Sequence, residues 1–392
     1  MDGIRAFRRE DIPEVARLWL RVFRRRAEGV STPLQDYFRE IFFDGPWRDP
    51  ELPSLVYEEG AMGIVGFLGV IPRTMIFEQQ PIRVAVPCQL MADERARTYP
   101  ATKLMRRFLA GCQDLSFADG ANEQSENLWR ACGGVAAGLH SLKWTRILRP
   151  ARYLRVRLKE RLDWKYAWLC DALQPVSWAI DTVAGWTTPG ARLLPGGSRL
   201  VVEQEPADQT LHSCVERLAD DRVLRPAYQR ERFRWLLARA AEKRMYGSLR
   251  RAVVRAPDGG IEGWYLYYLK PGGVGQVLQL GARPKRMREV LNCLFNEALQ
   301  AGAVAISGGV EPRFARELAA TRCELSWPDC AVLVHSRHRE ILNAIHRGDA
   351  FFSRLEGEWW ARFSDPAWTV DAPAADRALL QVNQIQNTPV RP

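Results

Sequence analysis

One order of predicted strands and helices occurs twice along this chain of 392 residues. Short apolar runs bounded by turn residues predict strands, and apolar residues spaced three and four apart predict helices. Residues 4–148 and residues 200–336 both give the order β-α-α-β-β-β-α-β-α, and each copy is followed by a further predicted strand. This repetition predicts an α/β protein of two similar lobes, each built on a mixed sheet.

Residues 151–198 do not follow this order. They contain Trp164, Trp168, Trp178 and Trp186 among prolines that break helices. Short amphipathic helices that link the lobes are predicted here, and the alternative is a surface that rests on lipid or holds an acyl chain. The predicted domains are a first lobe over 1–150, a helical linker over 151–198, a second lobe over 199–364 and a loose tail over 365–392.

Composition excludes several classes of protein. The chain is 47% hydrophobic and 26% charged, which is typical of a globular protein and not of a disordered one. It contains no long uncharged apolar run and no apolar leader at its start, so neither a membrane span nor a signal peptide is expected. Eight cysteines without a C-x-x-C pair predict neither a zinc ribbon nor a dithiol site. We expect a soluble, reduced, cytoplasmic protein.

The net charge of +10 is spread along the chain. Arginine suits phosphate groups, so a phosphate-rich partner is one interpretation, and a codon bias toward arginine is the other. No dense basic tail or zinc-finger spacing is present, so DNA binding is not predicted.

Three segments of the first half share a pattern with a known family. Residues 61–72 read AMGIVGFLGVIP, residues 84–109 read VAVPCQLMADERARTYPATKLMRRFL, and residues 122–133 begin with Asn122 and end with Gly133. These segments resemble the third strand, the fourth strand with its acyl-donor loop, and the N-x-x-A-x-x-L-Y-x-x-x-G segment of the GNAT acyltransferase superfamily. The doubled order resembles its two-domain members.

The resemblance implies transfer of an acyl group from a thioester of CoA, including acetyl-CoA, or of an acyl carrier protein. The acceptor would be an amine on a small molecule or peptide, and no metal is implied. A strand that separates from its neighbour offers backbone groups to the pantetheine arm, and the amides that start the next helix hold the pyrophosphate. By this resemblance the donor-binding residues are Leu90, Met91, Arg95, Arg97, Thr98, Thr102, Lys103 and Asn122.

The sequence departs from the family's pattern at three positions. The family loop is R-x-x-G-x-G/A, whereas here Pro100 and Thr102 stand at its last two small positions. Proline has no N–H to offer a phosphate. Trp129 replaces the tyrosine that often protonates the leaving thiolate in the family.

Three residues are candidates for proton transfer. Asp93 ends the predicted fourth strand, and Glu311 follows the corresponding fifth strand of the second half. Tyr265 lies on a strand with Tyr267 on the same face, either as an acid in an acceptor pocket or as core packing. His335 and His338 are three apart, but no third metal ligand accompanies them.

Two other functions remain open from the sequence. An aminoacyl-tRNA-dependent transferase of the peptidoglycan cross-bridge type would have the same two-lobed plan, and its positive charge would meet RNA phosphate. A binding or scaffold protein with decayed sites would explain Pro100 and Thr102. If the chain is an acyltransferase, we expect the acceptor between the lobes, because pockets prefer such junctions.

Overall fold

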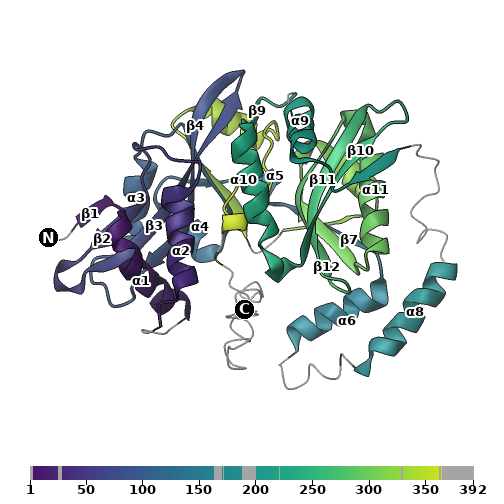
Figure 1. Cartoon of the computed structure of the whole chain (residues 1–392), viewed down its shortest axis with the longest axis horizontal. Helices are drawn as coiled ribbons and strands as arrows, with labels where there is room; N and C mark the ends of the chain where they lie inside the picture. Colours follow the sequence, from purple (N-terminus) through teal and green to yellow (C-terminus); the bar gives the residue numbers. More distant parts are fainter. Residues whose placement is uncertain are drawn as a thin grey trace. The chain divides into compact units, whose positions relative to one another are not determined.

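The structure is a computed structural model that describes residues 3–24, 29–162, 170, 172–187, 200–219, 221–327, 330–361 and 363. The chain forms two compact units (Figure 1). Unit 1 consists of Met1–Gly138, Arg222–Leu236 and Cys330–Asp365. Unit 2 consists of Leu139–Asp221, Leu237–Asp329 and Pro366–Pro392. Each unit contains one mixed sheet.

The sheet of unit 1 has the order β1-β2-β3-β4-β5-β15-β6, with β9 paired to the far end of β3. Neighbouring strands are antiparallel except β4 and β5, which run parallel. The strands are β1 (Gly3–Ala6), β2 (Leu55–Glu58), β3 (Ile64–Phe77), β4 (Gln80–Ala92), β5 (Leu115–Ala121), β6 (Val135–Ala136), β9 (Leu224–Pro226) and β15 (Ala331–His335).

Helices cover both faces of this sheet. Leu68 of β3 belongs to an apolar core with Leu104, Phe108 and Trp129. The adjacent Phe67 packs instead on Phe38 and Phe42, and neighbouring residues of a strand point to opposite faces. The first face is covered by α3 (Pro100–Leu109) and α4 (Glu123–Ala131), and the second by α1 (Ile12–Arg24), α2 (Thr32–Arg39) and the turn η2 (Glu40–Asp44).

The sheet of unit 2 has the order β14-β7-β13-β12-β11-β10-β8. Its main core lies between the sheet and α11 (Met287–Gln300), where Leu291, Leu294 and Phe295 are buried. The strands are β7 (Lys143–Ile147), β8 (Val201–Gln204), β10 (Ser248–Arg255), β11 (Ile261–Leu269), β12 (Val274–Ala282), β13 (Ala305–Gly309) and β14 (Glu324–Ser326). The other helices of the chain are α5 (Gly138–Ser141), α6 (Pro150–Arg161), α8 (Gln174–Thr187), α9 (Asp208–Leu218), α10 (Arg230–Ala241), α12 (Ala315–Ala320) and α13 (Arg339–His346). Among them, α13 belongs to unit 1, and α5 and α10 begin in unit 1 and end in unit 2.

The last predicted strand of each half joins the other sheet. β7 pairs with β13 and β14, and its Trp144 is buried in the core of unit 2. β15 pairs with β5 and β6, and its Leu333 is buried in the core of unit 1. The units therefore do not follow the contiguous division into 1–150 and 199–364. An apolar run predicts that a strand forms, but the edge that it joins depends on which core its side chains fill.

The predicted linker is helical where the structure describes it, in α6 and α8. Trp164, Trp168 and the predicted tail over 365–392 lie outside the described residues. No helix within the described ranges is long and apolar enough to cross a bilayer.

Gly281 of β12 tests the packing of the second sheet. A Cβ at this position would lie 2.0 Å from the ring of Trp264, its cross-strand neighbour on β11. Trp264 is fully buried and donates its indole N–H to Gln279, so the ring has no free space into which it can move. We expect Gly281→Ala to lower the free energy of unfolding by about 1–3 kcal/mol. The control is Gly309→Ala, where nothing lies within 4 Å; equal denaturant midpoints for the two variants would contradict the packing.

Candidate functional site

The parallel strands β4 and β5 of unit 1 separate soon after they meet. They pair only at Val84 with Leu115 and at Ala85 with Ser116. Beyond these pairs β4 continues to Ala92 along β3, and β5 continues to Ala121 along β15. No described strand pairs with the edge of β4 that faces away from β3 after Ala85. Backbone N–H and C=O groups on such an edge can pair with an extended ligand.

A bulge lies in β4 within this unpaired stretch. Phe67 pairs with Met91 and Gly69 with Cys88, so β4 carries an extra residue. Gln89 takes the left-handed conformation there, with φ of 53°. Its side chain accepts a hydrogen bond from the Trp19 indole at 3.2 Å and donates one to the Tyr37 hydroxyl at 3.1 Å. These contacts from α1 and α2 hold a backbone geometry that a residue other than glycine rarely adopts.

Residues 353–361 contact β5 directly and are linked to β4 through Tyr37 of α2. Tyr37 donates to the carbonyl of Ala361 at 2.6 Å, on the side of the β4 bulge. The backbone N–H of Glu358 donates to Asp119 of β5 at 2.7 Å. A Cβ at Gly357 would lie 2.1 Å from the Asp119 carboxyl carbon, so glycine is needed for this approach. The segment thus contacts the site from the side of the sheet that carries α1 and α2.

Asp93, predicted as a base, is held between two arginines. Arg95 donates to both of its carboxylate oxygens at 2.9 and 2.8 Å, and Arg21 donates at 3.0 Å. The hydrogen bonds from Arg95, opposed by desolvation, lower the pKa of Asp93 to about 2. A carboxylate with such a low pKa has little affinity for a proton near neutral pH, which disfavours Asp93 as a base. The same hydrogen bonds occupy the guanidinium of Arg95.

A carboxylate of the chain lies against residues 93–99, the loop in which the resemblance predicts donor binding. The backbone N–H of Arg97 lies 3.3 Å from both oxygens of Glu59, a buried carboxylate. The hydroxyl of Thr98 is buried and has no hydrogen-bond partner among the described residues. Tyr99 takes a left-handed conformation before Pro100, and Pro100 packs so closely on Gly66 that a Cβ there would lie 2.9 Å away.

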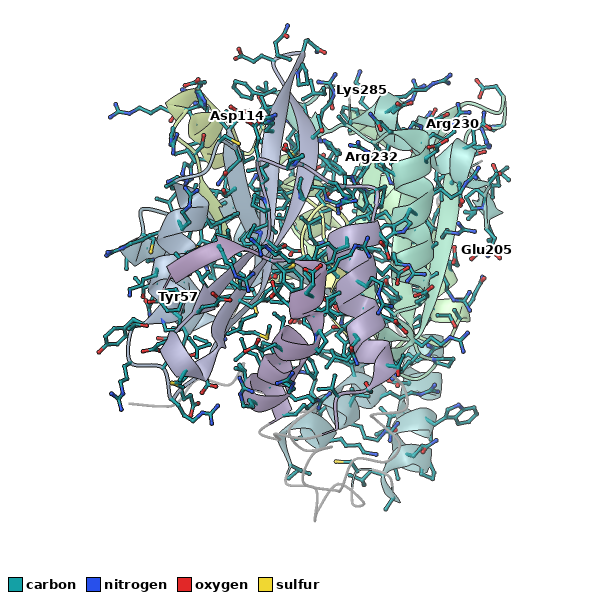
Figure 2. All side chains as sticks on the ribbon, turned by 60° about the vertical axis from the view of Figure 1, so that its left-hand side comes forward. Tyr57, Asp114, Glu205, Arg230, Arg232 and Lys285 are labelled. Atoms are coloured by element: carbon teal, nitrogen blue, oxygen red, sulfur yellow. The ribbon has the colours of Figure 1, made fainter. Side chains whose placement is uncertain are left out.

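The first turn of α3 follows this loop. Thr102 is half-buried in that turn, and Lys103 donates to the Tyr57 hydroxyl at 2.9 Å (Figure 2, which labels Tyr57). Leu90 packs against the core, and Met91 is fully buried on β4. The structure therefore brings the predicted residues from Leu90 to Lys103 together along β4 and the start of α3.

Asn122 caps α4 in this structure. Its side chain accepts a hydrogen bond from the N–H of Ser125 at 2.9 Å, as an N-cap residue does. Trp129 is buried in the core and carries no acidic proton suited to a thiolate. Residues 122–133 therefore have a structural role in this fold, in which Asn122 caps α4 and Trp129 fills the core.

Tyr265 lies in the core of unit 2. It is fully buried and donates to Glu297 at 2.7 Å, and Tyr267 donates to the other oxygen of Glu297 at 2.9 Å. Burial and the neighbouring carboxylate raise the pKa of both tyrosines. Tyr265 thus lies in the core, where burial and Glu297 hold its proton, and a role for it as an acid stays a prediction. Glu311, half-buried, precedes the turn that leads into α12.

Unit 2 has only some of the features described for β4 and β5 of unit 1. β12 also carries a bulge between its pairs with Leu266 and Tyr267, and it runs parallel to β13 over three pairs. β13 ends at Gly309, two residues after its last pair with β12, so only β12 continues well beyond the paired stretch, whereas both β4 and β5 do. The loop after β12 contains the exposed Lys285 (Figure 2).

A second cluster in unit 1 was missed by the sequence analysis. Arg73 of β3 is buried, and its three guanidinium nitrogens have no hydrogen-bond partner among the described residues. Its guanidinium carbon lies 3.8 Å from the ring centre of Trp47 and 5.3 Å from that of Trp360. Burial lowers the pKa of Arg73 to about 10, so the group stays charged at neutral pH. The charge of Arg232 on α10 (Figure 2) acts in the same direction.

Glu356 belongs to the same cluster. It is buried, accepts a hydrogen bond from the Tyr228 hydroxyl and accepts another from the N–H of Ser353 at 2.6 Å. Burial raises its pKa, although both hydrogen bonds and the charge of Arg73 oppose this effect. The only signal in the sequence was the acidic and aromatic run LEGEWW over 355–360. Nothing in the sequence connects it with Arg73, because they are far apart along the chain.

Comparison with known proteins gives a likeness of fold. No family model matches this sequence, and neither does any curated protein. A probable N-acyltransferase from Enterococcus faecalis is 10% identical with a TM-score of 0.56, over 86% of this chain and 73% of that one. A GCN5-related N-acetyltransferase from Anabaena variabilis is 10% identical with a TM-score of 0.56, over 86% and 74%. One from Kribbella flavida is 12% identical with a TM-score of 0.52, over 86% and 72%.

The sequence resemblance and the structural likeness agree on the architecture. Unit 1 contains two parallel strands that separate after a short pairing, and a helix that follows β4 after a loop. The chain therefore has the fold of the GCN5-related N-acetyltransferase superfamily.

Proposed function

We propose that this chain is an N-acyltransferase that takes an acyl group from an acyl-CoA thioester and transfers it to an amine, and that unit 1 holds the donor. The observation that carries this proposal is the separation of β4 from β5 after two residue pairs, with both strands continuing. The free edge of β4 offers peptide groups to the amides of a pantetheine arm.

The donor would lie along Leu90 and Met91, with its phosphates at the start of α3. The fit is incomplete, because Pro100 has no N–H and Glu59 already accepts the N–H of Arg97. Phosphate binding would therefore depend on the first-turn amides of α3, near Thr102, and on the side chains of Arg97 and Lys103. The buried Thr98 hydroxyl supports a polar ligand at this place.

The reaction needs one proton acceptor for the amine. The amine nitrogen attacks the thioester carbonyl carbon, the C–S bond breaks, and the thiolate takes a proton while the ammonium loses one. Glu356 is our candidate for the acceptor of the ammonium proton. Its pKa is raised by burial, so it can exchange a proton closer to neutral pH than Asp93 can.

Arg73 suggests the class of acceptor. A buried guanidinium without hydrogen bonds has five N–H groups available in a planar arrangement that matches a carboxylate. Arg73 lies on β3, and the charge of Glu356 acts on it. We propose that the amine acceptor also carries a carboxylate, as an amino acid or a peptide does.

The affinity of the protein for CoA can show which of the two units binds the donor. We expect Arg97→Ala to weaken CoA binding by about threefold to tenfold, because one exposed phosphate contact contributes about 1 kcal/mol. Lys285→Ala, in the corresponding loop of unit 2, is the matched control and should leave the dissociation constant unchanged. Calorimetric titration with CoA measures both. A loss confined to the Lys285 variant would place the donor in unit 2, and no binding by the unaltered protein would end the proposal.

Glu356→Gln tests the proposed base. Glutamine keeps the size and hydrogen bonds of a protonated glutamate but accepts no proton, so turnover should fall at least about a hundredfold with unchanged CoA affinity. In the unaltered protein, turnover should rise with pH through the raised pKa of Glu356.

Stability gives a second readout for Glu356. Above pH 4.5, the ordinary pKa, the unfolded state releases this proton while the folded state retains it up to the raised pKa. The stability that Glu356 contributes therefore falls as pH rises through this range. The melting temperature of Glu356→Gln minus that of the unaltered protein should increase over the same range. A constant difference, or full turnover in the variant, would remove Glu356 from this role.

Arg73→Met separates binding from packing. Methionine replaces an unpaired buried charge by an apolar chain of similar length, so we expect an unchanged or higher melting temperature. If Arg73 binds the acceptor, KM for an amine with a carboxylate should rise at least about tenfold, while KM for the corresponding amide should not change. Lower stability with equal KM for both acceptors would show that Arg73 serves only to pack between Trp47 and Trp360.

A further inference from the structure

Exposed apolar side chains concentrate on the helix pair α6 and α8 of unit 2. Fifteen large apolar side chains are exposed in the described part of the chain, and seven of them lie between residues 154 and 180. Those seven are Leu154, Leu158, Leu162, Leu173, Val176, Trp178 and Ile180, with exposed fractions of 40–60%. A concentration of this kind is typical of a surface that meets an apolar partner.

The apolar residues of α6 lie between basic ones. Leu154 and Leu158 are one turn apart and share a line on the helix surface. At 3.6 residues per turn, Arg155 and Arg157 lie about 80° to either side of that line. The twelve residues of α6, PARYLRVRLKER, contain five basic side chains and one acidic side chain. Arg157 is exposed beside this apolar line, whereas Arg155 on its other side is half-buried and donates to the carbonyl of Cys170 at 3.5 Å.

The second helix adds an apolar line of its own. Val176 and Ile180 are one turn apart on α8, and Leu173 lies one turn before Val176. Ser177 is buried and lies about 80° around the helix from this line. The apolar surface thus extends over both helices.

Polar contacts hold the two helices together. Asp181 of α8 accepts hydrogen bonds from the backbone N–H groups of Ala151 at 2.9 Å and Arg152 at 3.1 Å. These two amides lie in the first turn of α6, where no helix carbonyl can accept them. The Arg152 side chain also pairs with Asp181 at 3.4 Å, and Asp181 is 5% exposed. The two helices are therefore held side by side.

We propose that this α6–α8 surface binds to the face of an anionic lipid bilayer. Leucines would enter the boundary between headgroups and acyl chains, and the exposed Arg157 beside them would reach lipid phosphates through its long aliphatic stem. Anionic headgroups match the excess of positive charge on α6. Two copies of this surface would instead place one basic α6 against another, which like-charge repulsion disfavours. The helices lie on the bilayer and do not cross it, since neither is long and apolar enough.

Vesicle co-sedimentation of the full chain tests this proposal. We expect binding to phosphatidylcholine vesicles that contain phosphatidylglycerol, weaker binding to pure phosphatidylcholine, and loss of binding as salt increases. Leu154→Glu with Leu158→Glu should reduce the bound fraction at least about tenfold. Arg157→Gln with Lys159→Gln should reduce binding to anionic vesicles only. The matched control is Val201→Glu, an apolar residue of β8 that is 59% exposed, which should bind normally.

Two further measurements keep the result interpretable. Melting temperatures show whether the leucine variant folds, and Ile180→Gln provides a milder change on the other helix if it does not. Size-exclusion chromatography gives the oligomeric state. The proposal is overturned if the unaltered protein ignores anionic vesicles, if the leucine variant binds as well as Val201→Glu, or if the leucine variant only splits a dimer. CoA titration is a separate readout, so failure here leaves the proposed acyl transfer untouched.

Discussion

The separation of β4 from β5 is the constraint on which the candidate site depends. Two parallel strands that pair at only two positions leave a row of backbone groups without strand partners, and such groups are costly unless a ligand or solvent satisfies them. The bulge at Gln89 bends β4 within this stretch and is held by Trp19 and Tyr37. Residues 353–361 contact β5 at Asp119 and α2 at Tyr37, whose hydroxyl also bonds Gln89 of β4. The bulge in β4, helices α1 and α2, and residues 353–361 are thus connected by hydrogen bonds around the separated strands.

Charge is distributed unevenly around this site. On the donor loop, carboxylates of the chain itself engage groups that would otherwise meet a phosphate: Glu59 lies at the N–H of Arg97, and Asp93 engages Arg95. On the side of residues 353–361, Arg73 is a buried cation that lies against two tryptophan rings and has no hydrogen bond within the described part of the chain, and the charge of the buried Glu356 acts on it. A buried charge without hydrogen bonds is costly to keep. Such cost is typical of a functional position, where binding and stability compete.

The part of the candidate site along β4 and the start of α3 was largely predictable, and the part formed by residues 353–361 was not. The residues from Leu90 to Lys103 are consecutive enough that a strand, a loop and a helix start place them together. Arg73 and Glu356 meet only because 353–361 returns to the first sheet, and no local pattern reports such a return. Asp93 and Tyr265 were suitable residue types in suitable elements, but their partners, Arg95 and Glu297, decide their protonation.

By itself the sequence determined the type and order of most strands and helices, because apolar periodicity is a local property that each segment carries. It also determined the excess of positive charge and the concentration of tryptophans after residue 150. Only the tertiary structure decided that β7 joins the sheet of unit 2 and β15 that of unit 1. Register and partner are set by which core Trp144 and Leu333 fill, and that choice involves residues more than a hundred positions away.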